Sequence, residues 1–353
     1  MAELNELLES LGDWSHAGSD RSSTASQRAA RGADALLLSI ERTAMACEFE
    51  VLLNRGQYPH GVEKAGVALD AVARLESLLS VYLPTSDFST INRFASQRPI
   101  PVSTNTLELI RAAQAIHDMT DGAFDITAGS LSEVWGFSRR HGRVPSPQEI
   151  DHALAASGSQ HVVIDELNRV LYSKPGININ PGGIGKGYAL DIAARILVQA
   201  GTYDFMLHGG RSSIVAVGNR QSHDVEQGWI VALKHPWRFE EVLGTIRLHN
   251  AALGTSGSGK QFFHFEGKRY SHIIDPRTGR PADGMMSSTV ICNSGTAADA
   301  LATAMFVLGP EKSAEFCEAH PEIGAILVYQ DSKSGSMQIA KHNVQPDHWQ
   351  PRK

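Results

Sequence analysis

The segment Ser288-Thr-Val-Ile-Cys292 is followed after two residues by Gly295-Thr-Ala-Ala-Asp-Ala-Leu-Ala-Thr303, and this pair of stretches says most about the fold. The first is a run of β-formers and the second has a helical composition, so a strand leads into a helix N-terminus. Asp299 and Thr303, four residues apart, share one face of that helix. A carboxylate and a hydroxyl so placed suit Mg²⁺ that also binds phosphate. They also have a structural interpretation, an acid near a helix N-terminus and a hydroxyl bonded to a carbonyl of the preceding turn.

Outward from this segment, strands and helices alternate irregularly along the chain. Apolar spacing and caps predict helices at 62–82, 103–119, from Ser146, at 186–200 and 297–308, and from Pro310. Runs of β-formers predict strands at 36–40, 48–53, 161–165, 170–173, 204–208, 213–217, 229–233, 241–249, 288–292, 323–329 and 337–339. Because the order lacks the regular strand-helix repeat of a doubly wound sheet, we expect an α+β fold with mixed, mostly antiparallel sheets and packed helices.

The ends of the chain differ in composition from its centre. Residues 1–35 are rich in Ser, Ala and Arg, and we expect a disordered or loosely docked tail there. A large domain, with room for two coupled subdomains, is expected at 36–345, and a short C-terminal tail at 346–353. The first forty residues carry four acids before any basic residue and have no secretory signal pattern. No apolar run is long enough for a membrane helix, so we expect a cytoplasmic protein without membrane insertion.

Composition and charge exclude several functional classes. With 42% hydrophobic and 20% charged residues, the 353-residue chain has the makeup of a globular protein. A net charge of −6 provides no basic field for nucleic acid, which we therefore do not expect as a partner. The three cysteines, Cys47, Cys292 and Cys317, cannot all pair within one chain and lie in apolar stretches where free thiols pack. We assign none of them to catalysis.

Two glycine-rich segments resemble phosphate-binding loops without matching one. Gly254-Thr-Ser-Gly-Ser-Gly-Lys260 has the spacing of a P-loop, but Gln261 follows the lysine and a strand begins where a helix should. A turn at Thr255-Ser256-Gly257 could bind phosphate through backbone N–H groups or be a plain hairpin turn. In the segment 178–191, four glycines let a ligand approach the backbone, and Lys186 brings positive charge to a helix start. A structural turn would explain those glycines but not the lysine.

Two further segments offer acid and base groups. Gly122-Ala-Phe-Asp-Ile-Thr127 follows a helix and places an acid and a hydroxyl on a short extended segment, a pattern that is also typical of caps and turns. Ser271-His-Ile-Ile-Asp-Pro-Arg-Thr-Gly279 holds a titratable base, His272, with Asp275 three residues away. A single histidine is commonly structural, so His272 gains weight only together with the other segments.

Taken in chain order, these segments resemble the FAD:protein FMN transferase family, the ApbE flavin transferases. The resemblance covers roughly residues 40–330. It runs through 41–45, 78–82, 89–92, 122–125, 182–188, 208–210, 255–257, 271–279 and 298–303. It implies that the chain moves the FMN half of FAD to a Ser or Thr hydroxyl of an acceptor protein and releases AMP, with Mg²⁺ as the metal.

The resemblance also implies roles for particular residues. His272 matches the family's catalytic histidine. On physical grounds, and not from the resemblance, we expect Asp275 to orient its ring. Mg²⁺ would bind the side chains of Asp299 and Thr303 and the backbone carbonyl of Gly183. The flavin site would comprise Met45, Tyr82, Ala123, Phe124, Asp125, Asn180, Lys186, Thr255, Ser256, Gly257 and Ile273. In physical terms, His272 would take the proton of the attacking hydroxyl, and Mg²⁺ with Lys186 would neutralise the pyrophosphate. Tyr82 would stack on the isoalloxazine ring.

Two alternatives use the same residues. Water in place of the protein hydroxyl would make the chain an FAD pyrophosphatase, and loss of chemistry would leave a flavin-binding or carrier protein. Retention of His272, Asp299 and Thr303 argues against the carrier, since storage needs no base. The sequence also departs from the family pattern: Asn180 and Pro181 replace a usual acid and its neighbour, Ala46 and Cys47 replace a small residue and Thr, and His208-Gly-Gly210 lacks the usual Asn.

Overall fold

The computed structural model describes residues 10–16, 36–138, 141–220, 228–331 and 333–352. Its centre is an eight-stranded sheet in which every pair of neighbours is antiparallel. In spatial order its strands are β1 (Leu37–Ala44), β2 (Cys47–Asn54), β6 (Phe205–Gly209), β7 (Ser213–Val217), β10 (Ala251–Gly257), β15 (Met285–Cys292), β16 (Gly324–Gln330) and β17 (Met337–His342). The prediction of an α+β fold with mostly antiparallel strands is confirmed.

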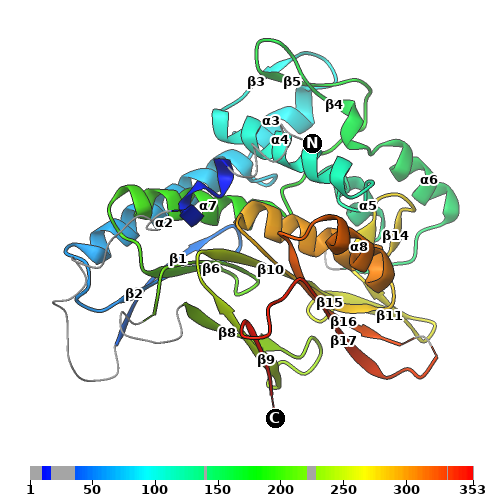
Figure 1. Cartoon of the computed structure of the whole chain (residues 1–353). Coiled ribbons are helices and arrows are strands. Elements are labelled where there is room, and N and C mark those ends of the chain that lie inside the picture. Colours follow the sequence, from blue (N-terminus) through cyan, green and yellow to red (C-terminus); the bar gives the residue numbers. More distant parts are fainter. Residues whose placement is uncertain (1–9, 17–35, 139–140, 221–227, 332, 353) are drawn as a thin grey trace.

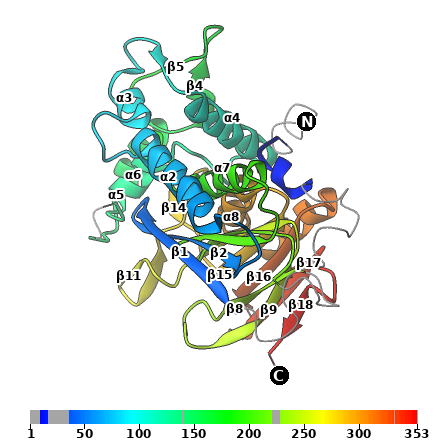
Figure 2. The ribbon, with the colours of Figure 1, turned by 90° about the vertical axis from the view of Figure 1, so that its left-hand side faces the viewer.

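Helices cover one face of this sheet. Figures 1 and 2 show α2 (Gly61–Leu79), α7 (Gly185–Gln199) and α8 (Gly295–Ala319) lying across it. Farther from the sheet lies a second group of elements: α3 (Asp87–Phe94), β3 (Ile100–Pro101), α4 (Thr104–Met119), α5 (Gly129–Val134), α6 (Pro147–Ala155), η2 (Ser159–His161), β4 (Val162–Ile164) and β5 (Arg169–Tyr172). None of the described helices is both long and apolar enough to cross a bilayer.

The opposite face of the sheet carries smaller β structures. β8 (Trp229–Lys234), β9 (Val242–Leu248) and β18 (Trp349–Pro351) form a three-stranded sheet in the order β18-β9-β8. Its apolar face packs on Ile214 and Leu253 of the large sheet. Two hairpins, β11 (Phe262–Phe265) with β12 (Lys268–Ser271) and β13 (Ile274–Asp275) with β14 (Arg280–Pro281), follow β10.

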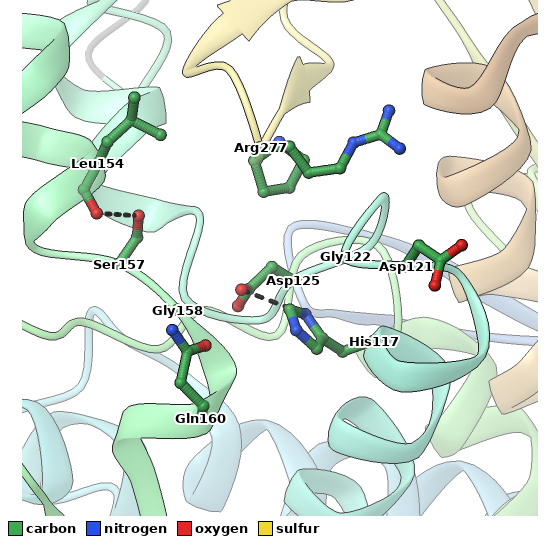
Figure 3. Close-up of a pocket in the computed structure, with 10 residues that line it drawn as sticks. His117, Asp121, Gly122, Asp125, Leu154, Ser157, Gly158, Gln160 and Arg277 are labelled. Atoms are coloured by element: carbon green, nitrogen blue, oxygen red, sulfur yellow. Dashed lines mark hydrogen bonds and ion pairs between the residues drawn. The ribbon is translucent and has the colours of Figure 1, made fainter.

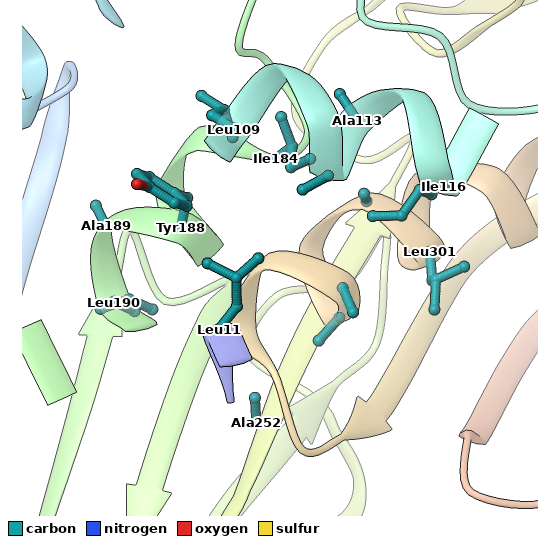
Figure 4. Packing of buried hydrophobic residues seen from close by; sticks show 14 of the residues in the cluster. Leu11, Leu109, Ala113, Ile116, Ile184, Tyr188, Ala189, Leu190, Ala252 and Leu301 are labelled. Atoms are coloured by element: carbon teal, nitrogen blue, oxygen red, sulfur yellow. The ribbon is translucent and has the colours of Figure 1, made fainter. Parts of the chain in front are cut away.

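The largest core lies between the helices and the large sheet (Figure 4). Leu109 and Ile116 of α4 meet Tyr188 of α7 and Leu301 of α8 there, and all four are fully buried. These contacts follow from the helical periodicity of the sequence, because apolar residues three or four apart lie on one face of a helix. Val67 lies within the predicted 62–82 helix but does not join this core: it is exposed on α2 because it lies off the buried face.

The N-terminal prediction is wrong for residues 10–16. This segment ends in a short helix, η1 (Asp13–His16), and it buries Leu11 and Trp14 in the main core. Burying two large apolar side chains gives a segment this short enough free energy to dock. The rest of the predicted tail, 1–9 and 17–35, lies outside the described residues.

Three other expectations need correction. Residues Thr255–Gly257 are the end of strand β10, which pairs with β7 and β15, and are not a turn. The glycines there suggested a loop, but Gly254 is required because a Cβ would lie 2.2 Å from the carbonyl oxygen of Ala298 in α8. Residues 349–351 are not a free tail, since β18 pairs with β9 and buries Trp349. The helices α3 and α5 were not predicted.

Candidate active site

A cavity of about 980 Å³ runs between the N-terminal ends of α7 and α8 and the strands beneath them. It brings together most of the residues singled out in the sequence, although they come from segments far apart in the chain. The predicted residues on its wall are Ala123, Phe124, Asp125, Asn180, Gly183, Lys186, Thr255, Ser256, Gly257, His272, Ile273, Asp299 and Thr303. Three predicted residues, Met45, Tyr82 and Asp275, are not part of its wall.

The carboxylate of Asp299 lies at the crossing of α7 and α8. It is almost fully buried and accepts hydrogen bonds from Ser213 Oγ at 2.8 Å and from the backbone N–H of Gly187 at 3.1 Å. Lys186 Nζ lies 3.2 Å from both of its oxygens. The helices approach this closely because Gly187 has no side chain: a Cβ there would lie 2.0 Å from the carbonyl oxygen of Gly295. The buried carboxylate is therefore held rigidly beside a cation.

Thr303 lies one helical turn beyond Asp299 and faces the same cavity. Its Oγ1 is 2.9 Å from Ser256 Oγ on β10. Gly183, with φ of 86°, passes so near that a Cβ would lie 3.1 Å from Thr303 Oγ1. The carboxylate, the hydroxyl and the carbonyl of this region are the oxygen donors that Mg²⁺ prefers. The residues predicted as metal ligands thus fit a magnesium site in chemistry, and Lys186 shows that the position favours a cation.

A second buried carboxylate, which the sequence analysis did not identify, anchors the start of α8. Asp191 of α7 is fully buried and accepts hydrogen bonds from the backbone N–H groups of Gly295 and Thr296, at 2.7 and 2.8 Å. Trp14 of the N-terminal segment donates a further bond from Nε1 at 2.9 Å. Burial raises the pKa of Asp191, and these hydrogen bonds oppose that effect. Asp191 lies one helical turn after Gly187 and therefore on the same face of α7, and this spacing is the sequence signal that could have identified it.

His272 faces the cavity from the loop after β12. Its ring Nδ1 lies 3.1 Å from the carbonyl oxygen of Gln261, and its backbone N–H donates to the same oxygen at 3.2 Å. A carbonyl can only accept, so Nδ1 carries the proton and Nε2 of the neutral ring is free to take one. Burial lowers the pKa of His272, and the bond to Gln261 partly offsets this.

Asp275 does not orient His272. Both of its carboxylate oxygens bind the guanidinium of Arg277, from Nε at 2.8 Å and Nη2 at 2.9 Å. The orienting group is the Gln261 carbonyl instead. The sequence could not identify this group, because every residue has a backbone carbonyl and no residue type marks the one that contacts His272.

Asp125 lines both the large cavity and a second one of about 330 Å³, which Figure 3 shows. It accepts hydrogen bonds from Thr127 and Ser159, and His117 Nδ1 lies 3.3 Å from its Oδ2. Burial raises the pKa of Asp125, but the bonds from His117, Thr127 and Ser159 together bring it below its usual value. The hydrogen bond to the Asp125 carboxylate in turn raises the pKa of His117. Asp125 is thus a fixed anion that shapes the segment 123–127, a turn and not the extended segment predicted.

Met45 and Tyr82 lie apart from the cavity wall. Met45 and Ala46 form the two-residue turn between β1 and β2, and both have positive φ, 49° and 57°. A non-glycine pair in this conformation is strained, and such strain is concentrated at functional positions. Tyr82 is 80% exposed. An aromatic ring so placed has a free face for stacking.

The chain matches a known protein family over most of its length. The sequence model of the ApbE family matches residues 45–327. The chain is 36% identical over 245 residues to the FAD:protein FMN transferase of Salmonella typhimurium, covering 67% of this chain and 69% of that protein. It is 34% identical over 280 residues to the enzyme of the same name from Escherichia coli K12, covering 77% of each.

Solved structures give the same result for the fold. The ApbE protein of Thermotoga maritima superposes with a TM-score of 0.75 at 31% identity, over 86% of this chain and 96% of that one. The apo flavinyl transferase ApbE of Pseudomonas stutzeri superposes with a TM-score of 0.77 at 28% identity, over 87% and 94%. The eight-stranded sheet and its helices are therefore similar to those of flavin transferases.

Proposed function

The chain belongs to the ApbE family, and we propose that it is an FAD:protein FMN transferase that uses Mg²⁺ and moves FMN to a Ser or Thr hydroxyl, releasing AMP. One observation carries this assignment. A histidine with a free Nε2, His272, faces the same cavity as the oxygen donors of Asp299 and Thr303. A base beside a cation site suits the attack of a hydroxyl on the phosphoanhydride of FAD.

The transfer step follows from the position of His272. The acceptor hydroxyl loses its proton to Nε2 while its oxygen bonds to the phosphorus of the FMN half of FAD. The bond from that phosphorus to the AMP oxygen breaks, and AMP leaves with the electron pair. Because burial lowers the pKa of His272, the ring is neutral and ready to accept the proton at neutral pH.

Groups at the α7–α8 crossing would neutralise the negative charge of the pyrophosphate. Asp299, Thr303 and the carbonyl of Gly183 would hold Mg²⁺, which when bound neutralises phosphate oxygens and stabilises the leaving group. Lys186, at 3.2 Å from Asp299, supplies a second positive charge at the same place. Ser213 and the Gly187 N–H keep the Asp299 carboxylate oriented.

The remaining cavity wall would hold the flavin nucleotide. The segment Ala123–Asp125, Asn180, strand residues Thr255–Gly257 and Ile273 line it. Asn180 replaces a charged side chain with an amide, whose oxygen accepts from the backbone N–H of Gly182 at 2.8 Å. Met45 and Tyr82 would contact the flavin from outside this wall, Tyr82 by stacking.

The deciding experiment incubates the purified full chain with FAD and Mg²⁺, with and without a candidate acceptor domain. AMP, free FMN and the mass of the acceptor are followed together. AMP with an acceptor mass gain of one FMN is the expected result. AMP with free FMN alone would identify a pyrophosphatase, and intact bound FAD would identify a carrier.

The metal assignment has its own test. Asp299→Asn keeps the size of the side chain but removes its charge, so the Mg²⁺ concentration for half-maximal activity should rise more than about tenfold. Asp283→Asn is the matched control, because Asp283 is an exposed acid that pairs with Lys268 away from the cavity. An unchanged Mg²⁺ requirement in Asp299→Asn would remove this residue from the metal site.

A further inference from the structure

The outer part of the cavity runs along the free edge of a strand. Five successive residues of β8, Ile230 to Lys234, line it, whereas β9 contributes Ile246 alone. Successive side chains of a strand point to opposite faces, so a cavity that touches five in a row follows the strand lengthwise. Among the described residues β8 pairs only with β9, and its other edge carries unpaired backbone groups.

The end of β8 is connected to the catalytic histidine. Its last residue, Lys234, leads into His235 and Pro236, and the Pro236 carbonyl lies so close to Gly259 that a Cβ there would be 2.0 Å away. Two residues beyond Gly259, the Gln261 carbonyl holds the ring of His272. A segment bound along β8 would therefore reach the region of His272 at its end.

The rim of this part of the cavity carries uncompensated positive charge. Lys234, Lys260 and Arg211 are exposed and line the cavity, and no carboxylate of the described residues forms an ion pair with any of them. The acids on the same wall each have a lysine or histidine partner. These pairs are Glu50 with His208, Asp125 with His117, and Asp299 with Lys186. The free charge here is positive although the whole chain carries a net charge of −6.

Apolar groups on this rim favour a protein partner over a small anion. Ile230 is 60% exposed on the outer side of β8, and Phe239 is exposed on the loop that follows. Both line the cavity. Exposed apolar side chains beside free cations and an unpaired strand edge match an extended peptide that carries acidic residues.

We propose that the free edge of β8 receives an extended, acidic segment of the acceptor protein. The segment adds a strand to the β18-β9-β8 sheet, its acids pair with Lys234 and Lys260, and its Ser or Thr lies near His272. This inference rests on the proposed function and identifies the partner of the same site. Backbone hydrogen bonds provide the affinity and the two lysines provide the preference for acidic sequences.

The experiment measures binding, so it does not depend on FMN transfer. Two fluorescein-labelled 12-residue peptides, each with one central Thr and apolar residues at alternate positions, carry either four Asp or four Lys. Fluorescence polarisation gives their affinity for the full chain with FAD and Mg²⁺. We expect the acidic peptide to bind at least about tenfold more tightly. N-methylation of its alternate amides should weaken binding, since these amides pair with the edge.

Charge-reversal variants locate the binding surface. In Lys234→Glu/Lys260→Glu the preference for the acidic peptide should disappear, while the affinity for FAD, read from flavin fluorescence, stays unchanged. Lys312→Glu, which reverses an exposed charge on α8 outside the cavity, should keep the preference. Equal affinity for the two peptides, no binding of either, or a preference that survives in the double variant would overturn the proposal. Acidic-peptide binding without FMN transfer to any acceptor would retain the acidic-segment site at β8 and refute the transferase.

Discussion

The two sides of the cavity are built in opposite ways. The inner wall, formed by Lys186, Gly187, Asp299 and Thr303, is buried or half-buried, and its charges are paired or hydrogen-bonded. The outer wall, formed by β8, Phe239 and the segment 259–261, exposes an aromatic ring and unpaired cations. Fixed dipoles and charges stabilise a developing phosphate charge without reorganisation, which favours the buried design. An exposed surface suits a protein partner, so the proposed chemistry and the proposed recognition fall on different walls.

The largest expected effect comes from His272, the base of the proposed transfer. In His272→Ala the rate of FMN transfer should fall by about 10² to 10⁴, because no side chain takes the proton of the acceptor hydroxyl. FAD binding should persist, because the inner wall is untouched. Single-turnover transfer and flavin fluorescence measure the two quantities. A transfer rate unchanged at matched FAD and Mg²⁺ would show that the base lies elsewhere.

The pH dependence of the same residue sharpens this test. Because burial lowers the pKa of His272, its neutral form persists below the ordinary value of 6.5. The transfer rate of the wild type should therefore stay level as pH falls past 6.5 and decline only at lower pH. Its contribution to stability has the same sign, present above about pH 6.5 and lost as pH falls below it. A decline of the rate centred at or above pH 6.5 would contradict this.

Gly187→Ala should break the inner wall. The new Cβ would lie 2.0 Å from the Gly295 carbonyl oxygen and 2.8 Å from Asp299 Cβ, so α7 and α8 must separate. We expect the free energy of unfolding to fall by about 3 kcal/mol, measured by urea denaturation. Gly66→Ala is the control: no atom lies within 4 Å of its Cβ, and a helix-interior alanine should add about 0.5–1 kcal/mol. Similar effects of the two changes would refute a tight crossing.

Trp14→Phe tests how far the inner wall extends. Phenylalanine keeps most of the buried ring but removes the hydrogen bond to the buried carboxylate of Asp191. The free energy of unfolding should fall by about 1.5 kcal/mol, because the bond is to a group that can carry charge. Thermal unfolding with and without Mg²⁺ and FAD measures it. A variant as stable as the wild type would show that the hydrogen bond from Trp14 to Asp191 does not contribute to stability.

Arg269→Lys should have the smallest effect and acts on the β11–β12 hairpin next to the outer wall. The Arg269 guanidinium lies 3.9 Å from the ring centroid of Phe262 and 4.8 Å from that of Trp237, and it donates to Ser258. Lysine keeps the charge but not the planar fork. We expect a loss of about 1 kcal/mol and faster hydrogen exchange in β11 and β12. Exchange that is unchanged there would show that the stack does not anchor the hairpin.

Local patterns predicted the elements that depend on neighbours in sequence. The helices α2, α4, α6 and α7 follow from the 3.6-residue period, and the capping box of Ser146 and Glu149 is present at α6. Strand β10 was missed because its glycines look like a loop. Their reason is the close approach of Ala298 in α8, which no local pattern contains.

The sequence by itself determined which chemical groups the protein would use. Thirteen predicted site residues line one cavity because their motifs keep the residue types that phosphate chemistry needs. Only the tertiary structure decided how these groups are held: His272 by the Gln261 carbonyl, Asp299 by Ser213, and the start of α8 by Asp191 with Trp14. The physical reason is that hydrogen-bond partners and close backbone approaches join residues 11 to 177 positions apart. The sequence therefore indicates the chemistry that each side chain can perform, and the tertiary structure determines which groups each side chain contacts.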